Sequence, residues 1–267
     1  MREVILRVPR RAVEDVLDRL LPIVPGGVRE VPAGRHVELH MRGERLPASR
    51  EIEATANRWS HTISEVEVSD DWRERRLADY EPDVIGSRLV VRPEWAPSPD
   101  PKLIDIEIAE SAAFGGGTHP TTRTCLEWLL ELPPAGSFAD LGCGTGVIAI
   151  LAARLGWSPV LALDVQPGSV EATRANAERN GVQVEAAVED LSVEPPPTAD
   201  AFAANVPAAL HAKIAAGWRV TAPRGGLVSG FDRDEADAVT HAYAATGMHE
   251  RRRASVGGWA VVVLERD

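Results

Sequence analysis

Hydrophobic and polar residues alternate with two different periods in the first part of the chain. Alternation at every residue predicts β-strands, whereas apolar residues repeated every three or four positions predict helices. The predicted strands are "EVILRV", "GRHVELHMRG" and "ISEVEVSDDW", and the predicted helices are "RRAVEDVLDRLLPIV" and "PASREIEATANRW", the second with Ser49 as its N-cap. We therefore predict a small α+β domain of the ferredoxin-like type over residues 1–68.

Prolines dominate a later segment. The stretch "RPEWAPSPDPKL" carries four prolines between Arg92 and Leu103, and proline restricts the backbone and removes a hydrogen-bond donor. We predict a linker over residues 69–103, with a helix in it and a stiff proline-rich end, and a second domain that begins at residue 104.

From residue 104 onward, short apolar runs alternate with helical stretches, which predicts a parallel sheet covered by helices on both faces. The predicted strands are "SFADLGC", "SPVLALDV", "VQVEAAV", "ADAFAANV" and "GGLVSGF", and the helices are "HPTTRTCLEWLLEL", "GVIAILAARLG", "PGSVEATRANAERNG", "PAALHAKIAAGW" and "DEADAVTHAYAATG". The tail "HERRRASVGGWAVVVLERD" predicts a hairpin at Gly257 and Gly258. Residues 104–267 are thus predicted to form an α/β domain with a seven-stranded, Rossmann-like sheet.

Composition limits the classes of function. The 267 residues carry a formal net charge of −11, which argues against nucleic-acid binding because each phosphate contact needs a local Lys or Arg. The arginines at 251–253 are accordingly expected on a solvated edge strand. No apolar run reaches the roughly 18 residues of a membrane span, and charges interrupt the N-terminus where a signal peptide is apolar. Cys125 and Cys143 lack the spacing of a zinc site, so we expect a cytoplasmic protein without a metal.

A glycine-rich turn marks a candidate nucleoside site. In "DLGCGTGVIAI" an apolar strand ends at Gly142, Gly144 follows, and an apolar helix begins; ligands bind at such strand ends. Asp164 ends the next strand, where its carboxylate can accept hydrogen bonds from ribose hydroxyls. The spacing is G-x-G-x-G, unlike the G-x-G-x-x-G of dinucleotide sites, and Asp140 precedes it. This carboxylate would repel a pyrophosphate and favour the ammonium and sulfonium groups of S-adenosylmethionine.

Two later strands also end in polar residues. Glu189 and Asp190 follow the third strand and are candidates for the adenine amino group, with a solvated acidic pair as the alternative. The fourth strand ends at Asn205, before Val206 and Pro207. Its side-chain carbonyl and the adjacent backbone carbonyls can accept hydrogen bonds from an amine without charging it. Asn205 is therefore the candidate catalytic residue, which would align an amine with a methyl group.

The whole chain resembles the bacterial family of ribosomal protein L11 methyltransferases (PrmA), which are class I S-adenosylmethionine-dependent methyltransferases. The motifs that carry this resemblance are "SDDWRERR", "RLVVRPEW", "AFGGGTHPTTRTCLEWL", "DLGCGTGVIAI", "ATRANAERNGV" and "ANVPA". The resemblance implies a small N-terminal domain that docks the ribosomal protein. It also implies a C-terminal domain that methylates lysine side chains and the N-terminal amine, leaving S-adenosylhomocysteine.

The resemblance further implies that Thr121, Gly142, Asp164 and Asn205 bind the cofactor, with Asn205 also beside the acceptor. The complete expected cofactor-binding set is Thr121, Asp140, Gly142, Gly144, Asp164, Asp190 and Asn205. We also expect a monomer. The chain departs from the family's motifs at two places. In the family's usual Ala-Phe-Gly-Thr-Gly-Thr-His loop, Gly116 replaces the first Thr. In its Asn-Ile-Leu-Ala motif, Val206 and Pro207 replace Ile and Leu. Because proline restricts the residue before it, the acceptor geometry can differ.

The loop "AFGGGTHPTT" is expected to be a lid that orders over the cofactor, with Thr121 in contact with it. His119 is the nearest candidate base, and its alternative role, a cap for the following helix, is the favoured one. The tryptophans, Trp259 among them, are expected mainly to pack.

Three other functions fit the same residues. They are a small-molecule or peptide natural-product N-methyltransferase on this scaffold, a cofactor-binding module without catalysis, and, more distantly, an NAD oxidoreductase. Labelled cofactor offered to the ribosomal protein and to cell metabolites separates the first from protein methylation, and calorimetry with both cofactors tests the last.

Overall fold

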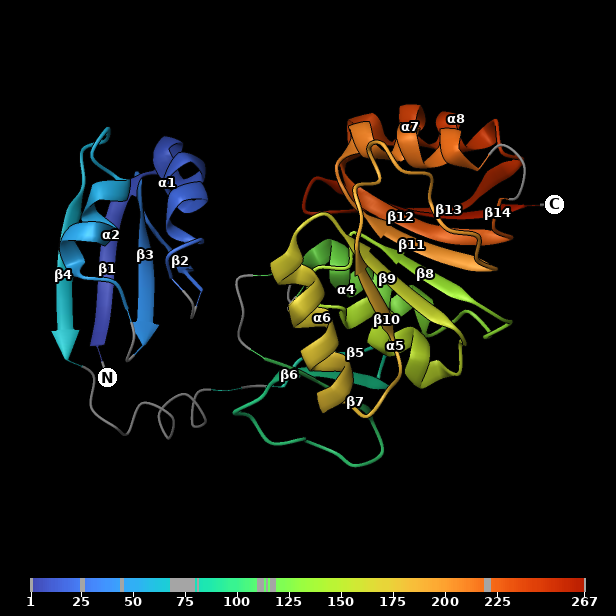
Figure 1. Ribbon diagram of the computed structural model, residues 1–267, viewed down its shortest axis with the longest axis horizontal. Helices are drawn as coiled ribbons and strands as arrows, with labels where there is room; N and C mark the ends of the chain where they lie inside the picture. Colours follow the sequence, from blue (N-terminus) through green and yellow to red (C-terminus); the bar gives the residue numbers. More distant parts are fainter. Residues whose placement is uncertain are drawn as a thin grey trace. The chain divides into compact units, whose positions relative to one another are not determined.

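The computed structural model describes residues 2–24, 27–43, 46–67, 80, 82–109, 113, 115, 119–218 and 222–266 (Figure 1). The chain forms two compact units, Met1–Glu81 with Glu110–Ala112 and Pro82–Ala109 with Ala113–Asp267. Each unit has a buried hydrophobic core of its own.

The first unit is a four-stranded antiparallel sheet with two helices. In chain order its elements are β1 (Arg2–Pro9), the 3-10 helix η1 (Arg10–Ala12), α1 (Val13–Leu20), β2 (Arg29–Ala33), β3 (His36–Gly43), α2 (Ser49–Thr55) and β4 (Thr62–Glu67). The strands lie in the order β2-β3-β1-β4. Leu6 and Leu39 of the sheet share a core with Val16 of α1 and Ile52 of α2. The βαββαβ order is that of the ferredoxin-like fold we predicted.

Two local predictions in this unit differ from the structure. The strand β2 was not predicted, because Pro32 interrupts its pattern; it lies at the sheet edge, where a proline is tolerated. Ser49 is the first residue of α2, and Ala48 takes the N-cap position instead. The Ser49 hydroxyl donates to Glu65 of β4, so it joins the helix to a strand and does not cap the helix.

Part of the segment predicted as a linker is folded into the second unit. The strands β5 (Val84–Ile85), β6 (Leu89–Pro93) and β7 (Ile104–Ile108) form a three-stranded sheet. The division of the chain therefore follows Glu81, not residue 103 as expected. The pairing of β6 with β7 spans the proline-rich segment, and no local pattern reports a partner that far along the chain. The motif at 69–76 lies outside the described residues.

A seven-stranded sheet forms the centre of the second unit. Its strands are β8 (Phe138–Leu141), β9 (Val160–Asp164), β10 (Glu185–Val188), β11 (Ala201–Asn205), β12 (Gly225–Asp232), β13 (Met248–Val256) and β14 (Trp259–Arg266). They lie in the order β10-β9-β8-β11-β12-β14-β13. β8 to β12 are parallel, and β14 is antiparallel to both neighbours. The predicted α/β sheet with a terminal hairpin is confirmed.

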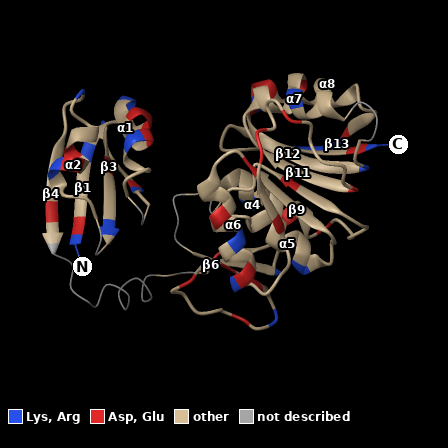
Figure 2. Ribbon diagram, in the orientation of Figure 1, with Lys and Arg blue, Asp and Glu red and all other residues tan. Residues whose placement is uncertain are grey.

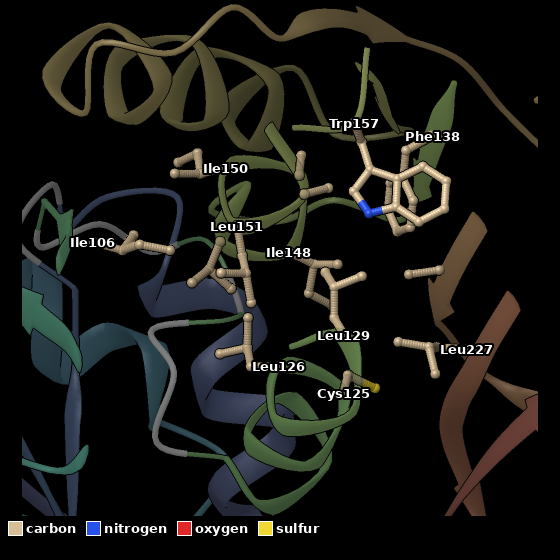
Figure 3. Close-up of a cluster of buried hydrophobic side chains, with 14 of the residues drawn as sticks. Ile106, Cys125, Leu126, Leu129, Phe138, Ile148, Ile150, Leu151, Trp157 and Leu227 are labelled. Carbon is tan, nitrogen blue, oxygen red and sulfur yellow. The ribbon is translucent and has the colours of Figure 1, made fainter. Parts of the chain in front are cut away.

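Helices cover both faces of this sheet (Figure 1). One face carries α4 (Pro120–Leu129), α5 (Val147–Leu155) and α6 (Pro167–Arg179), and the other carries α7 (Ala208–Gly217) and α8 (Ala236–Ala244). The η2 turn (Arg233–Glu235) leads into α8. Figure 3 shows the core of the first face, where Phe138 lies beside Trp157 and near Ile148. The chain changes direction across the sheet between β8 and β11, and ligands bind at such switch points.

Within the described ranges, no helix combines the length and the apolar character that crossing a membrane requires. The same residues contain no group of three or more His, Cys, Asp or Glu side chains placed to hold a metal ion.

Candidate active site

The turn between β8 and α5 contains the glycines singled out in the sequence. Gly142 and Gly146 both have a φ of +80°, a region that favours glycine. A Cβ atom on Gly142 would lie 2.4 Å from Val206 Cγ1, and one on Gly146 would lie 2.7 Å from Thr173 Cγ2. Glycine at these two positions therefore lets the backbone of the turn pack closely against the side chains of Val206 and Thr173. The sequence alone had related them to the approach of a ligand.

Asp164 is held at the glycine turn by two backbone N–H groups. Gly144 N donates to its Oδ2 at 3.0 Å and Gln166 N to its Oδ1 at 2.9 Å. One residue earlier, the Leu163 carbonyl accepts from Gly142 N at 2.8 Å. The carboxylate keeps further lone pairs at the sheet edge, so it can still accept hydrogen bonds from hydroxyl groups.

Asp140 lies beneath the same turn. It is only 2% exposed, and its Oδ2 accepts from Ala149 N in α5 at 3.1 Å. Burial, with the charge of Asp164 adding to it, raises the pKa of Asp140 to about 7, while the Ala149 hydrogen bond opposes the shift. A cation bound near Asp140 would favour its ionised form, so this residue can act through its charge from below the turn.

The two cysteines lie close to this carboxylate and are buried. Burial and the charge of Asp140 raise the pKa values of Cys125 and Cys143 to about 12. Thiols with such values stay protonated near neutral pH and are poor nucleophiles. Both are packing residues; Thr173 Oγ1 also donates to Cys143 Sγ at 3.2 Å.

Asn205 ends β11 and meets the start of α4. Its Nδ2 donates to Thr121 Oγ1 at 3.3 Å and to Thr122 Oγ1 at 3.4 Å. Both threonines are buried, at 1% exposure each. The structure thus brings together Asn205 and Thr121, two of the predicted site residues, although they lie far apart in the sequence. The contacts use the nitrogen of the Asn205 amide, so its oxygen Oδ1 keeps its lone pairs for other donors.

His119 caps α4, as expected. Its Nδ1 accepts from Thr121 N at 3.4 Å and lies 2.7 Å from Thr121 Oγ1. Since Nδ1 is an acceptor, the Thr121 hydroxyl donates to it and can accept from Asn205 at the same time. Burial lowers the pKa of His119, which favours the neutral ring that this cap requires. With Nδ1 engaged in the cap, that nitrogen is not free to act as a base.

The backbone after Asn205 is more constrained than the sequence suggested. We expected one or two backbone carbonyls beside Asn205 to face an acceptor. The Val206 carbonyl instead lies 3.1 Å from His211 Nε2, and the Pro207 carbonyl accepts from Leu210 N at 2.9 Å. The side chain of Asn205 is therefore the better placed acceptor at this strand end.

The acidic residues after β10 lie beside β9. Glu189 N donates to the Asp164 carbonyl at 3.0 Å. Asp190 is exposed, and its Oδ1 accepts from Ser192 N at 2.9 Å. Hydrogen bonds from the Ser192 side chain and backbone lower the pKa of Asp190. Its carboxylate thus forms part of a turn at the same edge as Asp164.

Sequence reasoning did not assign roles to two asparagines of α6. Asn176 Oδ1 accepts from Ala109 N at 3.0 Å, and its Nδ2 donates to the Thr145 carbonyl at 3.0 Å. Asn180, one turn later, bonds both the N–H and the carbonyl of Glu107. The motif "ATRANAERNGV" contains both residues, and their i, i+4 spacing places them on one helix face. They fasten β7 and the glycine turn to α6.

Trp259 was expected to be a packing residue. It begins β14, and its ring lies edge-on to His119, with 5.6 Å between ring centroids. An aromatic side chain therefore lies beside the residue that caps α4 next to Asn205. Phe114 and residues 116–118, including the Gly116 departure and the expected lid, lie outside the described residues. Gly115 is described, and its carbonyl accepts from Thr145 Oγ1 at 2.7 Å.

Comparison with known proteins gives one consistent family. The model of the family "Ribosomal protein L11 methyltransferase (PrmA)" matches residues 41–267. Ribosomal protein L11 methyltransferase from Cupriavidus pinatubonensis is 38% identical over 194 residues, which cover 69% of this chain and 62% of that protein. The same-named protein from Paraburkholderia xenovorans is 37% identical over 194 residues, with the same coverage. The chain thus spans about 62% of the length of these relatives.

Among solved structures, a ribosomal protein L11 methylase from Lactobacillus delbrueckii subsp. bulgaricus superposes with a TM-score of 0.63 at 23% identity. The match covers 70% of this chain and 100% of the solved chain. At this identity the likeness concerns the fold, which agrees with the α/β sheet described above.

Proposed function

This chain belongs to the family of ribosomal protein L11 methyltransferases, and on that basis we propose that it is an S-adenosylmethionine-dependent protein N-methyltransferase. The proposed acceptors are lysine side chains, the N-terminal amine, or both, of ribosomal protein L11. The observation that carries the proposal is the contact of Asn205 with Thr121 at the sheet edge that also holds Asp164. At this edge, the Asp164 carboxylate is suited to binding a nucleoside and the Asn205 amide is suited to binding an amine.

The residues at this edge fit S-adenosylmethionine. Asp164 offers a fixed carboxylate to ribose hydroxyls, and Asp140 supplies negative charge beneath the turn where a cationic ligand would lie. In the proposal Gly142 and Gly144 border the cofactor with backbone atoms, and Thr121 and Asp190 complete the site. When bound, the cofactor supplies a methyl group on a positively charged sulfur and leaves as S-adenosylhomocysteine.

Asn205 is proposed to orient the acceptor amine. Because Thr121 and Thr122 hold its Nδ2, Oδ1 is in position to accept an N–H hydrogen bond. An amide oxygen takes such a bond without removing the proton, so the amine keeps its lone pair for the methyl group. A lysine has an ordinary pKa of about 10.4, so the acceptor must lose its proton to solvent or to another group before transfer.

The first unit is proposed to recognise the protein substrate. Its sheet packs Val4 and Leu39 against the helices, which leaves the alternate residues of β1 and β3 on the opposite face. There Glu3 accepts from Arg42 at 2.7 Å and lies 2.9 Å from His40. A fixed polar face of this kind can make specific hydrogen bonds with a folded partner.

We further propose a monomer that acts in the cytoplasm and does not bind nucleic acid directly. The arginines of β13 support the last point, since Arg252 pairs with Glu131 at 2.8 Å and Arg253 with Glu250 at 2.6 Å. Figure 2 shows acidic and basic residues interspersed in the second unit. Arginines already paired with carboxylates offer little to phosphate groups.

The test is to incubate the protein with methyl-labelled S-adenosylmethionine and either purified ribosomal protein L11 or cell metabolites. We expect label in the ribosomal protein. Label confined to low-mass material contradicts the protein substrate and supports the small-molecule alternative. Cofactor binding with no transfer to any extract, including extract from cells lacking the gene, supports a module without catalysis.

A matched binding experiment tests the cofactor site. Asp164→Asn should weaken S-adenosylmethionine binding about tenfold, because it removes a charged acceptor from the ribose hydroxyls. Glu171→Gln, an exposed change on α6, is the control. Equal dissociation constants for the two variants by calorimetry would contradict the role given to Asp164.

A further inference from the structure

His211 lies on α7, directly behind the segment that follows β11. Its side chain is fully buried. Nε2 lies 3.1 Å from the Val206 carbonyl oxygen and 3.0 Å from the Ser229 carbonyl oxygen, and Nδ1 lies 3.0 Å from the Tyr243 hydroxyl. Carbonyl oxygens only accept hydrogen bonds, so Nε2 carries the proton and donates to both. Nδ1 therefore accepts from the Tyr243 hydroxyl, and the ring is neutral in a single tautomer.

Three contacts fix the backbone of Val206. Its N–H donates to the Ser229 carbonyl at 2.9 Å, its carbonyl accepts from His211, and Gly230 packs against it. A Cβ atom on Gly230 would lie 2.5 Å from both the nitrogen and the oxygen of Val206. Gly230 has a φ of +90° and lies in a β-bulge of β12, a feature that often redirects a strand beside a functional site. His211 thus joins the residue that follows β11 to the bulged part of β12, next to Asn205.

The surroundings of His211 keep this arrangement uncharged. Burial lowers the pKa of His211 to about 4, and burial raises the pKa of Tyr243. Phe231 packs edge-on against the imidazole, with 5.0 Å between ring centroids. Near neutral pH the imidazole therefore remains a donor to the two carbonyls, and Tyr243 remains a donor to the imidazole.

We propose that His211 is a positioning residue for the acceptor amine. It acts through the backbone of Val206 to hold Asn205 in place, and Tyr243 holds the imidazole in the orientation that this contact needs. The inference rests on the proposed function, because it concerns the same acceptor site. His211 binds two carbonyls that would otherwise be buried with fewer donors, and one of them belongs to Val206, the residue directly after Asn205.

The kinetic test compares His211→Leu, His211→Gln and Tyr243→Phe, with His241→Leu on the exposed side of α8 as the control. His211→Leu should lower kcat for methylation of ribosomal protein L11 about tenfold, with the cofactor dissociation constant changed less than about threefold. His211→Gln should recover most of kcat, because its amide nitrogen can donate to the same carbonyls. A His211→Leu protein with the kinetics of His241→Leu overturns the inference.

If His211→Leu does not fold, Tyr243→Phe decides. This variant keeps the aromatic packing but removes the Tyr243 donor, so Nδ1 is buried without this partner and the imidazole loses a contact that orients it towards Val206. We expect its kcat to fall and its cofactor affinity to stay the same. A kcat equal to that of the wild type overturns the inference.

A second readout does not depend on activity. Nitrogen NMR of the imidazole in the wild-type protein should show the neutral Nε2–H tautomer, and the Val206 amide should exchange slowly with solvent. In His211→Gln exchange should stay slow, and in Tyr243→Phe it should quicken. A wild-type protein that methylates no acceptor contradicts the proposed function alone; an Nδ1–H tautomer, or equal exchange in all proteins, overturns the positioning role.

Discussion

Asp140 lies one residue before the end of β8 and Asp164 ends the neighbouring β9, and their surroundings give them different properties. Asp164 is held by two backbone N–H groups at the sheet edge, whereas Asp140 is buried beneath the turn with one such bond. Their positions in the sequence suffice to predict that both lie beside the glycine turn. The difference in burial between them depends on α5 and α4, which pack over Asp140, and no short motif reports that packing.

The burial of Asp140 predicts a pH dependence of stability. Its pKa is about 7 in the folded protein, against a usual 3.8, so the folded state binds this proton more tightly. Its contribution to the free energy of unfolding is therefore complete below about pH 4 and falls as the pH rises to about 7. Asp140→Asn cannot ionise and keeps an acceptor for Ala149 N. Its stability relative to the wild type should rise by about 2–4 kcal/mol between about pH 4 and pH 8.

Urea unfolding across this pH range measures the difference. Asp200→Asn is the control, because hydrogen bonds from Ser137 lower the pKa of Asp200. The contribution of Asp200 is present above its usual pKa of 3.8 and is lost only as the pH falls below it. Its variant should differ from the wild type by a constant amount between about pH 5 and pH 8. A constant difference for Asp140→Asn as well would contradict the assigned pKa shift.

Gly142 gives a second prediction at this scale. An alanine there would adopt a positive φ and would place its Cβ against Val206. Gly181 also has a positive φ, of +63°, but a Cβ there meets nothing within 4 Å. Gly142→Ala should lower the free energy of unfolding by about 3 kcal/mol, and Gly181→Ala by about 1 kcal/mol. Chemical denaturation measures both, and equal losses would contradict the close packing of the turn against Val206.

Among the helices and strands, those whose structure depends on residues close in the sequence are predicted best. The strand–turn–helix from β8 to α5 and the helix α4 with its His119 cap follow from short patterns. The strands β5 and β6 were assigned to a linker because β7, the partner of β6, lies beyond the proline-rich segment. His211 was not identified because its role needs α8 and β12 to reach it.

The two asparagines of α6 provide the prediction for an element. Asn176 bonds Ala109 and Thr145, so it joins the end of β7 to the glycine turn. Asn176→Ala should lower the free energy of unfolding by about 1–3 kcal/mol, since it leaves the buried Thr145 carbonyl and the partly buried Ala109 N–H without this partner. The Ala109 amide should then exchange faster with deuterium. Glu178→Ala, an exposed change on the same helix, should alter neither quantity, and slow exchange at Ala109 in Asn176→Ala would contradict the link.

At the scale of the whole molecule, the chain combines a ferredoxin-like unit with a seven-stranded α/β unit. The order of strands and helices could be predicted from periodicity, because helices and strands alternate from β8 to β10 and again from β11 to α8. The division after Glu81 could not, because it depends on the pairing of β5, β6 and β7. The predicted site residues nevertheless gather at one sheet edge, because the ends of parallel strands meet there.

We propose that this protein methylates ribosomal protein L11 at a site organised by Asn205. The most direct measurement is the intact mass of ribosomal protein L11 from cells that carry the gene, lack it, or carry Asn205→Ala at an equal protein level. We expect added methyl masses in the first cells and their loss in the other two. Identical masses of ribosomal protein L11 in all three would contradict this proposal.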